Sequence, residues 1–326
     1  MSGRDLFGVE NTLLPDENDE LFIPLRAILK ELLATSGKGL RGELLLLSAG
    51  GPQEMAVRPE LQTLVFGVEL LHLATLVHDD LLDQSERRRG RPAVWKRWGA
   101  KTAVLVGDYL FATAYRILNT VCGPESMERV HFLLREMVGG ELAEETDRFR
   151  LVTANRYLAR IEKKTARFFQ VAAELGGAMA GLSGKIRREL GEFGRKLGMA
   201  FQLFDDLQDL TGDGKSGGKP VFQDLKNGVL TLPLLLISDQ PGFDEVLAEV
   251  EVKRKVRPGH RRLIRKWLTV RNVPAEIEGL IGNYCREAKA HLTGLNLPQI
   301  PLLCAFADGL FKPGEKRKKT KETFSI

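Results

Sequence analysis

Hydrophobic residues recur at the three- and four-residue spacing of an amphipathic helix through most of residues 20–311. No sustained alternation of apolar and polar positions indicates a β-sheet. Turn-length breaks rich in glycine and proline divide the pattern into roughly a dozen helices, and one long helix is expected over residues 61–83. The pattern predicts a single all-α domain over residues 20–311, built as a helical bundle around a central cavity.

Residues 1–19 and 312–326 fall outside the helical pattern. The first segment is a polar, acidic tail, and the second is a basic tail that contains the run KPGEKRKKTK. A tail of this composition is usually solvated, although contact with anionic lipid or with a diphosphate is an alternative. The basic tail lacks the interleaved aromatic residues typical of nucleic-acid binding. We therefore expect no nucleic-acid partner.

The composition is that of an ordinary globular protein. Of the 326 residues, 43% are hydrophobic and 28% are charged. Three scattered cysteines suggest a reducing compartment. The sequence shows neither a secretory signal nor an uninterrupted apolar run of about 18 residues. These features predict a cytoplasmic protein with at most peripheral membrane contact.

Carboxylates and arginines concentrate within residues 76–92, LVHDDLLDQSERRRGRP. Asp79, Asp80 and Asp83 stand at positions i, i+1 and i+4, so one helix can present all three to a common point. Carboxylates held this close repel one another unless a cation lies between them. Mg²⁺ favours such oxygen ligands and keeps other positions for phosphate oxygens. The arginines that follow suit phosphate binding.

The same spacing recurs in residues 201–209, FQLFDDLQD, as Asp205, Asp206 and Asp209. Two such clusters are expected by chance in only about 0.002 of chains of this length. If the clusters face each other, they form a clamp that binds a diphosphate through several Mg²⁺ ions. Gln202 lies on the same polar stripe of the predicted helix.

The two clusters resemble the paired aspartate-rich motifs of the trans-isoprenyl diphosphate synthases. The resemblance spans residues 37–233 and is strongest to bacterial long-chain members, such as the catalytic component of heptaprenyl diphosphate synthase. It implies the all-α isoprenoid synthase fold and a Mg²⁺-dependent prenyltransferase that condenses an allylic diphosphate with isopentenyl diphosphate. The implied product is a medium- or long-chain all-trans polyprenyl diphosphate, a precursor of quinone side chains.

The resemblance also implies roles for individual residues. All six aspartates would be catalytic, and the metal ligands would be Asp79, Asp80, Asp83, Asp205 and Asp209. Isopentenyl diphosphate would be held by Lys38, Arg41, His72 and Arg89. The allylic diphosphate would be held by Arg88, Lys164, Thr165 and Lys219, with Gln202 a further substrate-binding residue. Gly39 and Gly42 depart from the Arg and Pro that are usual around Arg41 in this family.

Product length in this family depends on the residues one turn before the first aspartates, here Ala74 and Thr75. Neither is aromatic, and this favours products longer than farnesyl diphosphate. A geranylgeranyl diphosphate synthase is the nearest alternative. A class I terpene cyclase has no need for the second diphosphate site. The remaining alternative is a subunit that is inactive without its partner, and we expect either a homodimer or a heterodimer with a non-catalytic subunit.

Overall fold

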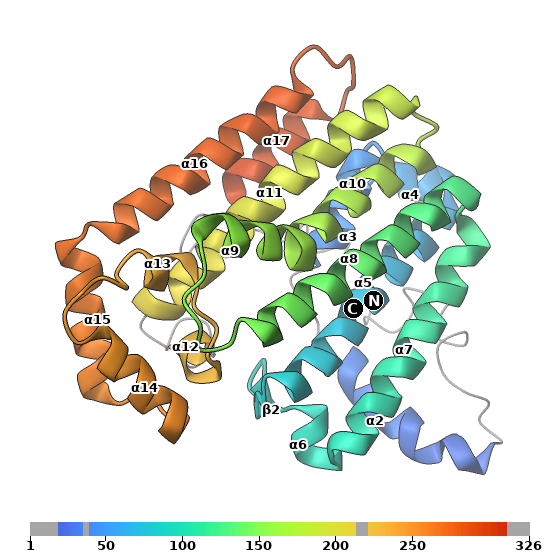
Figure 1. The fold of residues 1–326 in the computed structure, drawn as a ribbon. Coiled ribbons are helices and arrows are strands. Elements are labelled where there is room, and N and C mark those ends of the chain that lie inside the picture. The colour runs from blue at the N-terminus through green and yellow to red at the C-terminus, as the bar shows by residue number, and fades with distance from the viewer. Residues whose placement is uncertain (1–18, 35–38, 213–220, 312–326) are drawn as a thin grey trace. The chain divides into compact units, whose positions relative to one another are not determined.

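The computed structural model describes residues 19–34, 39–212 and 221–311. These residues form helices and a hairpin of two-residue strands (Figure 1), so the predicted all-α fold is confirmed. There are more helices than the expected dozen, because short ones such as α4 (Glu54–Val57) and α13 (Leu232–Leu235) span too few residues to show a period. Lys38, Lys219 and nearly all of both tails lie outside the described residues.

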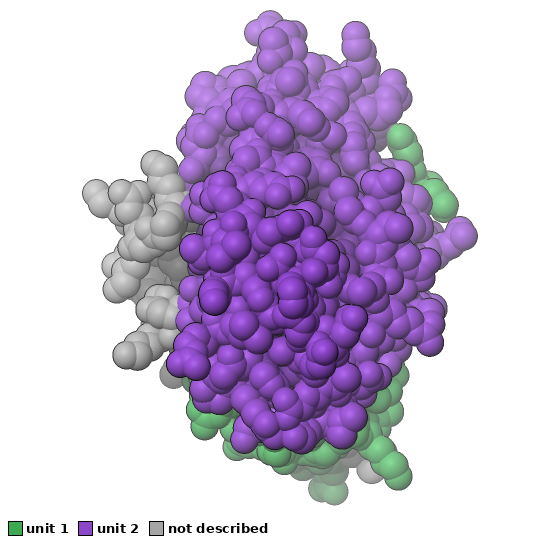
Figure 2. Space-filling view, turned by 60° about the vertical axis from the view of Figure 1, so that its left-hand side comes forward, with its two compact units in different colours: residues 1–128, 175–182, 312–326 green, residues 129–174, 183–311 purple. Residues whose placement is uncertain are grey.

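The chain divides into two compact units (Figure 2). Unit 1 comprises Met1–Glu128, Leu175–Leu182 and Lys312–Ile326, and unit 2 comprises Arg129–Glu174 and Ser183–Phe311. The first aspartate motif therefore belongs to unit 1 and the second to unit 2.

Unit 1 contains the helices and strands of the first third of the chain. They are η1 (Glu20–Phe22), α2 (Ile23–Leu33), α3 (Leu40–Ser48), α4, α5 (Pro59–Leu82), β1 (Arg87–Arg88), β2 (Arg91–Pro92), α6 (Val94–Trp98) and α7 (Ala100–Val121). Helix α8 (Pro124–Thr146) begins in unit 1, and α10 (Arg167–Met179) ends in it.

Helix α5 carries the first aspartate motif and forms the core of unit 1. By length and composition it could cross a membrane, but 56% of its most apolar window is buried inside the structure, as expected of a core helix. Helix α7 packs along α5 (Figure 1). A Cβ on Gly107 of α7 would lie 2.0 Å from Nε2 of His78 on α5. Glycine at position 107 thus allows the two helices to pack.

Unit 2 contains the second aspartate motif on its longest helix, α11 (Gly184–Thr211). Its other elements are α9 (Ala154–Ile161), η2 (Glu162–Ala166), α12 (Gln223–Asn227), α13, α14 (Phe243–Lys253), α15 (Pro258–Val270), α16 (Val273–Leu292) and α17 (Ile300–Gly309). Helix α16 lies beside α11 (Figure 1). Apolar residues of α11, such as Leu203 and Leu207, are buried with Ile277 and Ile281 of α16 in one core.

A π-helical turn, η2, joins α9 to α10. Its i→i+5 hydrogen bonding takes up one more residue than an α-helical turn does, and such turns occur often at functional sites. A sequence period of 3.6 predicts an ordinary helix here. Gly140 of α8 lies directly against the turn, because a Cβ at this position would be 2.8 Å from the backbone nitrogen of Lys164. The turn carries Lys164 and Thr165, both predicted substrate-binding residues.

Candidate diphosphate and metal site

The first aspartate motif ends helix α5. Asp79 and Asp80 lie in its last turn, and Asp83 is the C-cap residue. The Asp80 side chain is buried, and its Oδ2 accepts a hydrogen bond from Arg88 Nε at 2.7 Å. The structure thus brings together an aspartate and an arginine that the sequence assigns to the same site.

The hairpin that follows the motif sets the positions of its arginines. Strands β1 and β2 pair antiparallel, with Arg88 opposite Arg91. The two residues between them, Arg89 and Gly90, have φ of 50° and 81°, as the tight primed turns of hairpins require. Partial desolvation of the Arg89 guanidinium lowers its pKa, as does the charge of Arg88. An anion would therefore be attracted to two adjacent, mutually repelling cations.

Arg41 and His72 meet although 31 residues separate them in the sequence. Arg41 Nη1 lies 2.9 Å from His72 Nε2. Arginine can only donate, so Nε2 is the acceptor and the imidazole carries its proton on Nδ1. Desolvation by burial lowers the pKa of Arg41 to about 10, against the opposing effects of Glu69 and Asp79. Two predicted residues of the isopentenyl diphosphate site thus form one cluster in unit 1.

Glu69 is a member of this cluster that the sequence interpretation missed. Its Oε1 accepts a hydrogen bond from the backbone nitrogen of Gly42 at 2.7 Å. Burial raises the pKa of Glu69, while the Gly42 hydrogen bond and the charges of Arg41 and Arg89 lower it. Glu69 stands three residues before His72 on the same helix face. This spacing is the sequence signal that could have identified Glu69 as a neighbour of the site.

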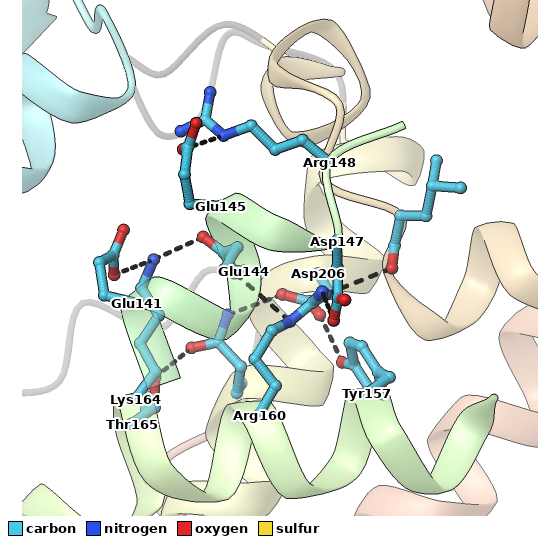
Figure 3. Close-up of polar contacts among 12 residues, drawn as sticks. Glu141, Glu144, Glu145, Asp147, Arg148, Tyr157, Arg160, Lys164, Thr165 and Asp206 are labelled. Carbon is cyan, nitrogen blue, oxygen red and sulfur yellow. Dashed lines mark hydrogen bonds and ion pairs between the residues drawn. The ribbon is translucent and has the colours of Figure 1, made fainter. Parts of the chain in front are cut away.

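In the second aspartate motif each aspartate has a different environment. Asp205 is exposed, Asp206 is buried, and Asp209 is half-buried. Asp206 Oδ2 accepts a hydrogen bond from the Tyr157 hydroxyl, and Oδ1 accepts one from Gln202 Nε2 at 2.7 Å (Figure 3). The side chain of Asp206 is therefore held by the protein on both oxygens.

Asp209 connects the motif to the short helix α12. Its Oδ1 accepts from the backbone nitrogen of Gln223 at 3.0 Å, and its Oδ2 accepts from that of Asp224 at 3.3 Å. These nitrogens belong to the first turn of α12, whose N–H groups have no partner within the helix. Asp209 thus caps α12 and places Asp224 next to the motif.

Negative charge accumulates around the second motif. Burial, together with the charges of Asp205 and Glu144, raises the pKa of Asp206 to about 7, against the opposing hydrogen bonds. The pKa of Asp224 is also raised well above its usual range, by burial first and then by Asp209 and its neighbours. Such a surplus of carboxylate charge fits a divalent cation. Within the described ranges, no three carboxylate, imidazole or thiol groups already lie close enough to share one metal ion.

Thr165 is linked to the second motif, and Lys164 lies beside it in η2 (Figure 3). Thr165 Oγ1 donates to Gln202 Oε1 at 2.7 Å, and Gln202 in turn donates to Asp206. Lys164 Nζ instead forms ion pairs with Glu141 at 2.8 Å and Glu144 at 2.6 Å. Two predicted residues, Thr165 and Gln202, are therefore hydrogen-bonded to the motif, and the third, Lys164, is paired with glutamates of α8.

The acidic partners of Lys164 were not predicted. Burial alone would raise the pKa of Glu144, but Lys164, followed by Arg160 and Arg148, outweighs burial and lowers it. Glu144 is therefore a charged, buried partner of a predicted phosphate-binding lysine. A run such as ELAEE shows acidic residues on a helix but not which of them face inward.

The predicted chain-length residues lie on α5 and are both buried. Ala74 is fully buried, and the Thr75 hydroxyl donates to the carbonyl oxygen of His72 at 2.8 Å. Their effect on product length stays a prediction.

The comparisons with known proteins place this site in a family. The polyprenyl synthetase family model matches residues 24–257. Heptaprenyl diphosphate synthase component 2 of Geobacillus stearothermophilus is 35% identical over 72% of this chain and 73% of its own length. Octaprenyl diphosphate synthase of Escherichia coli is 32% identical over 72% of each chain. Some relatives are matched over less of their length, such as 62% of component 2 of Bacillus subtilis.

Solved structures agree with these relatives. A polyprenyl synthase of Caulobacter crescentus, complexed with calcium and isoprenyl diphosphate, has a TM-score of 0.83 at 29% identity and covers 94% of each chain. Heptaprenyl diphosphate synthase of Staphylococcus aureus has a TM-score of 0.80 at 28% identity, covering 93% of this chain and 95% of that one.

The all-α fold and the two aspartate-rich helices, taken with these relatives, define a prenyltransferase of isoprenoid biosynthesis. The chain belongs to the polyprenyl synthetase family. The predicted family, fold and enzyme class are therefore confirmed.

Proposed function

We propose that the chain lengthens an allylic diphosphate by condensation with isopentenyl diphosphate and yields a medium- or long-chain all-trans polyprenyl diphosphate. The observation that carries this proposal is the contact between Arg41 and His72. The sequence assigns both residues to the isopentenyl diphosphate, and the fold brings them together beside Glu69 and the first aspartate motif. A terpene cyclase, which uses one diphosphate, has no need for such a cluster.

The chain's own residues would divide the work between two diphosphates. Arg41 and Arg89 are suited to hold the diphosphate of the acceptor through charge-assisted hydrogen bonds. His72 accepts from Arg41 through Nε2 and has Nδ1 3.4 Å from Thr75 Oγ1, so it would orient Arg41 toward the diphosphate. In the allylic half, Arg88 and Lys164 are cations already paired with carboxylates, namely Asp80 and the two glutamates Glu141 and Glu144. Binding a diphosphate would require these cations to exchange a carboxylate partner for phosphate oxygens.

The carboxylates of the two motifs fit Mg²⁺. Asp79, Asp83, Asp205 and Asp209 are the side chains proposed to hold it, whereas Asp80 and Asp206 are buried and engaged with protein donors. Bound Mg²⁺ would neutralise the charge that develops on the leaving diphosphate. The polyprenyl synthase of Caulobacter crescentus, whose structure holds calcium and isoprenyl diphosphate, supports divalent-cation binding in this fold.

The proposals for product length and for partners rest on the relatives. Heptaprenyl and octaprenyl diphosphate synthases are among them, and these two support a product longer than farnesyl diphosphate. Two of them are named component 2 of their enzyme. We infer from this that the chain is the catalytic member of a synthase that includes a second subunit.

The test is incorporation of radiolabelled isopentenyl diphosphate with farnesyl diphosphate and Mg²⁺, with products resolved by length. Discrete products of seven or more isoprene units from the purified chain would support the long-chain product and contradict the need for a second subunit. A stop at four units would indicate a geranylgeranyl product. If the chain alone is inactive, the extract of its source organism should restore activity. The D79A/D205A variant controls for contaminating synthase. An inactive chain that no extract restores would contradict the proposal.

A further inference from the structure

Tyr157 was not predicted from the sequence to have a role, yet it contacts the second aspartate motif directly. Its side chain is fully buried in unit 2. Its hydroxyl donates a hydrogen bond to Asp206 Oδ2 from helix α9, while Asp206 lies on α11 (Figure 3). The hydroxyl of a buried tyrosine usually finds a hydrogen-bond partner. Here it meets a carboxylate of the proposed metal site.

The contact fixes the rotation of α11 at the motif. Successive residues of an α-helix point about 100° apart. When Tyr157 of α9 holds Asp206 inward, Asp205 is turned away from the core, and it is in fact exposed. Helix rotation therefore decides which of the two aspartates is presented to a cation.

The same contact closes a chain of hydrogen bonds back to the π-helical turn. Thr165 donates to Gln202, and Gln202 donates to Asp206, which accepts from Tyr157. Tyr157 and Thr165 lie on either side of the start of η2, in which Lys164 forms its ion pairs. The hydrogen-bonded chain thus ties the second aspartate motif to Thr165, the residue that follows the predicted phosphate-binding Lys164 in the turn.

We propose that Tyr157 is a positioning residue that, through Asp206, aims Asp205 at the metal ion that binds the allylic diphosphate. The inference rests on the proposed function, because it assumes that Asp205 is a metal ligand. Hydrogen-bonding partners behind metal ligands set ligand orientation, and their loss typically lowers metal affinity about 10- to 100-fold. Tyr157 touches neither substrate nor metal in this scheme.

The test is a Mg²⁺ titration of the full chain at a fixed concentration of inorganic pyrophosphate, read as the rise in melting temperature. Y157F keeps the ring and removes only the hydroxyl. The Mg²⁺ concentration that gives half of the full rise should increase about tenfold relative to the wild type. Y284F is the matched control, since Tyr284 also lies in unit 2 but is not hydrogen-bonded to the motif, and it should stay within about twofold.

Two further measurements separate positioning from general stability. At saturating Mg²⁺ the kcat of Y157F should return to within about threefold of the wild type, because no reacting group has been removed. In a D206A background, which has no side-chain acceptor for the Tyr157 hydroxyl, Y157F should add less than about a twofold change, because its effect passes through Asp206. A full effect of Y157F in D206A, or a Y157F titration that matches the wild type, would overturn the inference.

The outcome also distinguishes this inference from the proposed function. If Mg²⁺ with pyrophosphate raises the melting temperature of the wild type but Y157F behaves identically, only the role of Tyr157 is wrong. If the wild type shows no response at all, the proposed metal site is wrong, and the inference falls with it.

Discussion

Arg41, which contacts His72, is predicted to bind one of the two substrates, and this role can be tested with a single substitution. R41K keeps the positive charge but loses the planar, multiple-donor guanidinium that now reaches His72. We expect the KM for isopentenyl diphosphate to rise by roughly tenfold, while the KM for the allylic diphosphate stays within about twofold. Steady-state kinetics with each substrate varied in turn measures the two. Equal rises in both values would contradict the assignment.

Glu69 is the residue whose removal should disturb this cluster without touching a substrate. E69A leaves the Gly42 backbone N–H without its acceptor, at a cost of about 1–3 kcal/mol in the free energy of unfolding. E69Q retains an amide oxygen that can accept the same hydrogen bond. Urea denaturation should therefore show a smaller loss for E69Q than for E69A. An equal loss would mean that the charge of Glu69, and not its hydrogen bond, stabilises unit 1.

The buried charge of Asp206 predicts a pH dependence. Its pKa is raised from 3.8 to about 7 in the folded chain. The folded state therefore binds the proton more tightly than the unfolded state does, and this stabilisation is present below pH 3.8 and lost as the pH rises through about 7. In EDTA, D206N should gain stability over the wild type between about pH 5 and pH 8, by roughly 1–3 kcal/mol.

Thermal melts across this pH range measure the gain. D239N is the control, because Asp239 is exposed and does not act on Asp206, so this change should produce no such gain. A constant difference between D206N and the wild type would show that Asp206 is already ionised throughout.

At the residue scale the sequence indicates chemistry better than it indicates contacts. Aspartate spacing and neighbouring arginines were enough to propose a metal and a diphosphate. Tyr157, Glu69 and Glu144 were missed because each acts through a partner far away in the sequence. Tyrosine and glutamate occur in many helices, so the residue type alone does not identify such a partner before the fold is known.

At the scale of elements, the π-helical turn depends on a close approach by α8. G140A adds a Cβ that would lie 2.8 Å from the Lys164 backbone nitrogen, and overpacking of this kind costs about 1–3 kcal/mol. We expect G140A to lower both stability and the affinity for the allylic diphosphate. The adjacent G139A is the matched control, because nothing lies within 4 Å of a Cβ there. Its higher helix propensity should stabilise the chain by up to about 1 kcal/mol.

Calorimetry and allylic-substrate kinetics on the two variants test this. Similar behaviour of G139A and G140A would contradict the role proposed for the contact between α8 and η2.

The long helices, such as α5, were predicted nearly to their ends because their apolar period persists over many turns. The π-helical turn was not, because one additional residue within one turn changes no period that a sequence window can detect.

At the scale of the whole molecule, positive charge is unevenly distributed. Residues 253–271 contain nine lysines and arginines and no aspartate or glutamate, although the whole chain has a net charge of only +5. Most of these cations are exposed, including Arg262 and Lys266 on α15. A local field of this kind governs binding to charged surfaces more than net charge does.

The chain should therefore bind a cation exchanger more tightly than its net charge suggests. R262E/K266E should elute at a lower salt concentration than K185E/R188E, which makes the same change in net charge on α11. Elution at equal salt would show that net charge alone decides retention.

At this scale the sequence could not determine how the two aspartate motifs are placed relative to each other. Helix periods show which face of a helix is buried within one unit, but they do not show how the units are arranged.

The additional residue of η2 also constrains how the segment from Tyr157 to Thr165 can change in length. Deletion of one residue within the EKKTA turn would let α9 and α10 continue as one regular α-helix. Because the wide turn accommodates this residue locally, the side chains of α9 and α10 would keep their faces after the deletion. Insertion of one residue between Tyr157 and η2 would act differently, since it would rotate Tyr157 by about 100° relative to Thr165 and away from Asp206. A change of one residue within the turn should therefore be tolerated where the same change beside it would disconnect the hydrogen-bonded network.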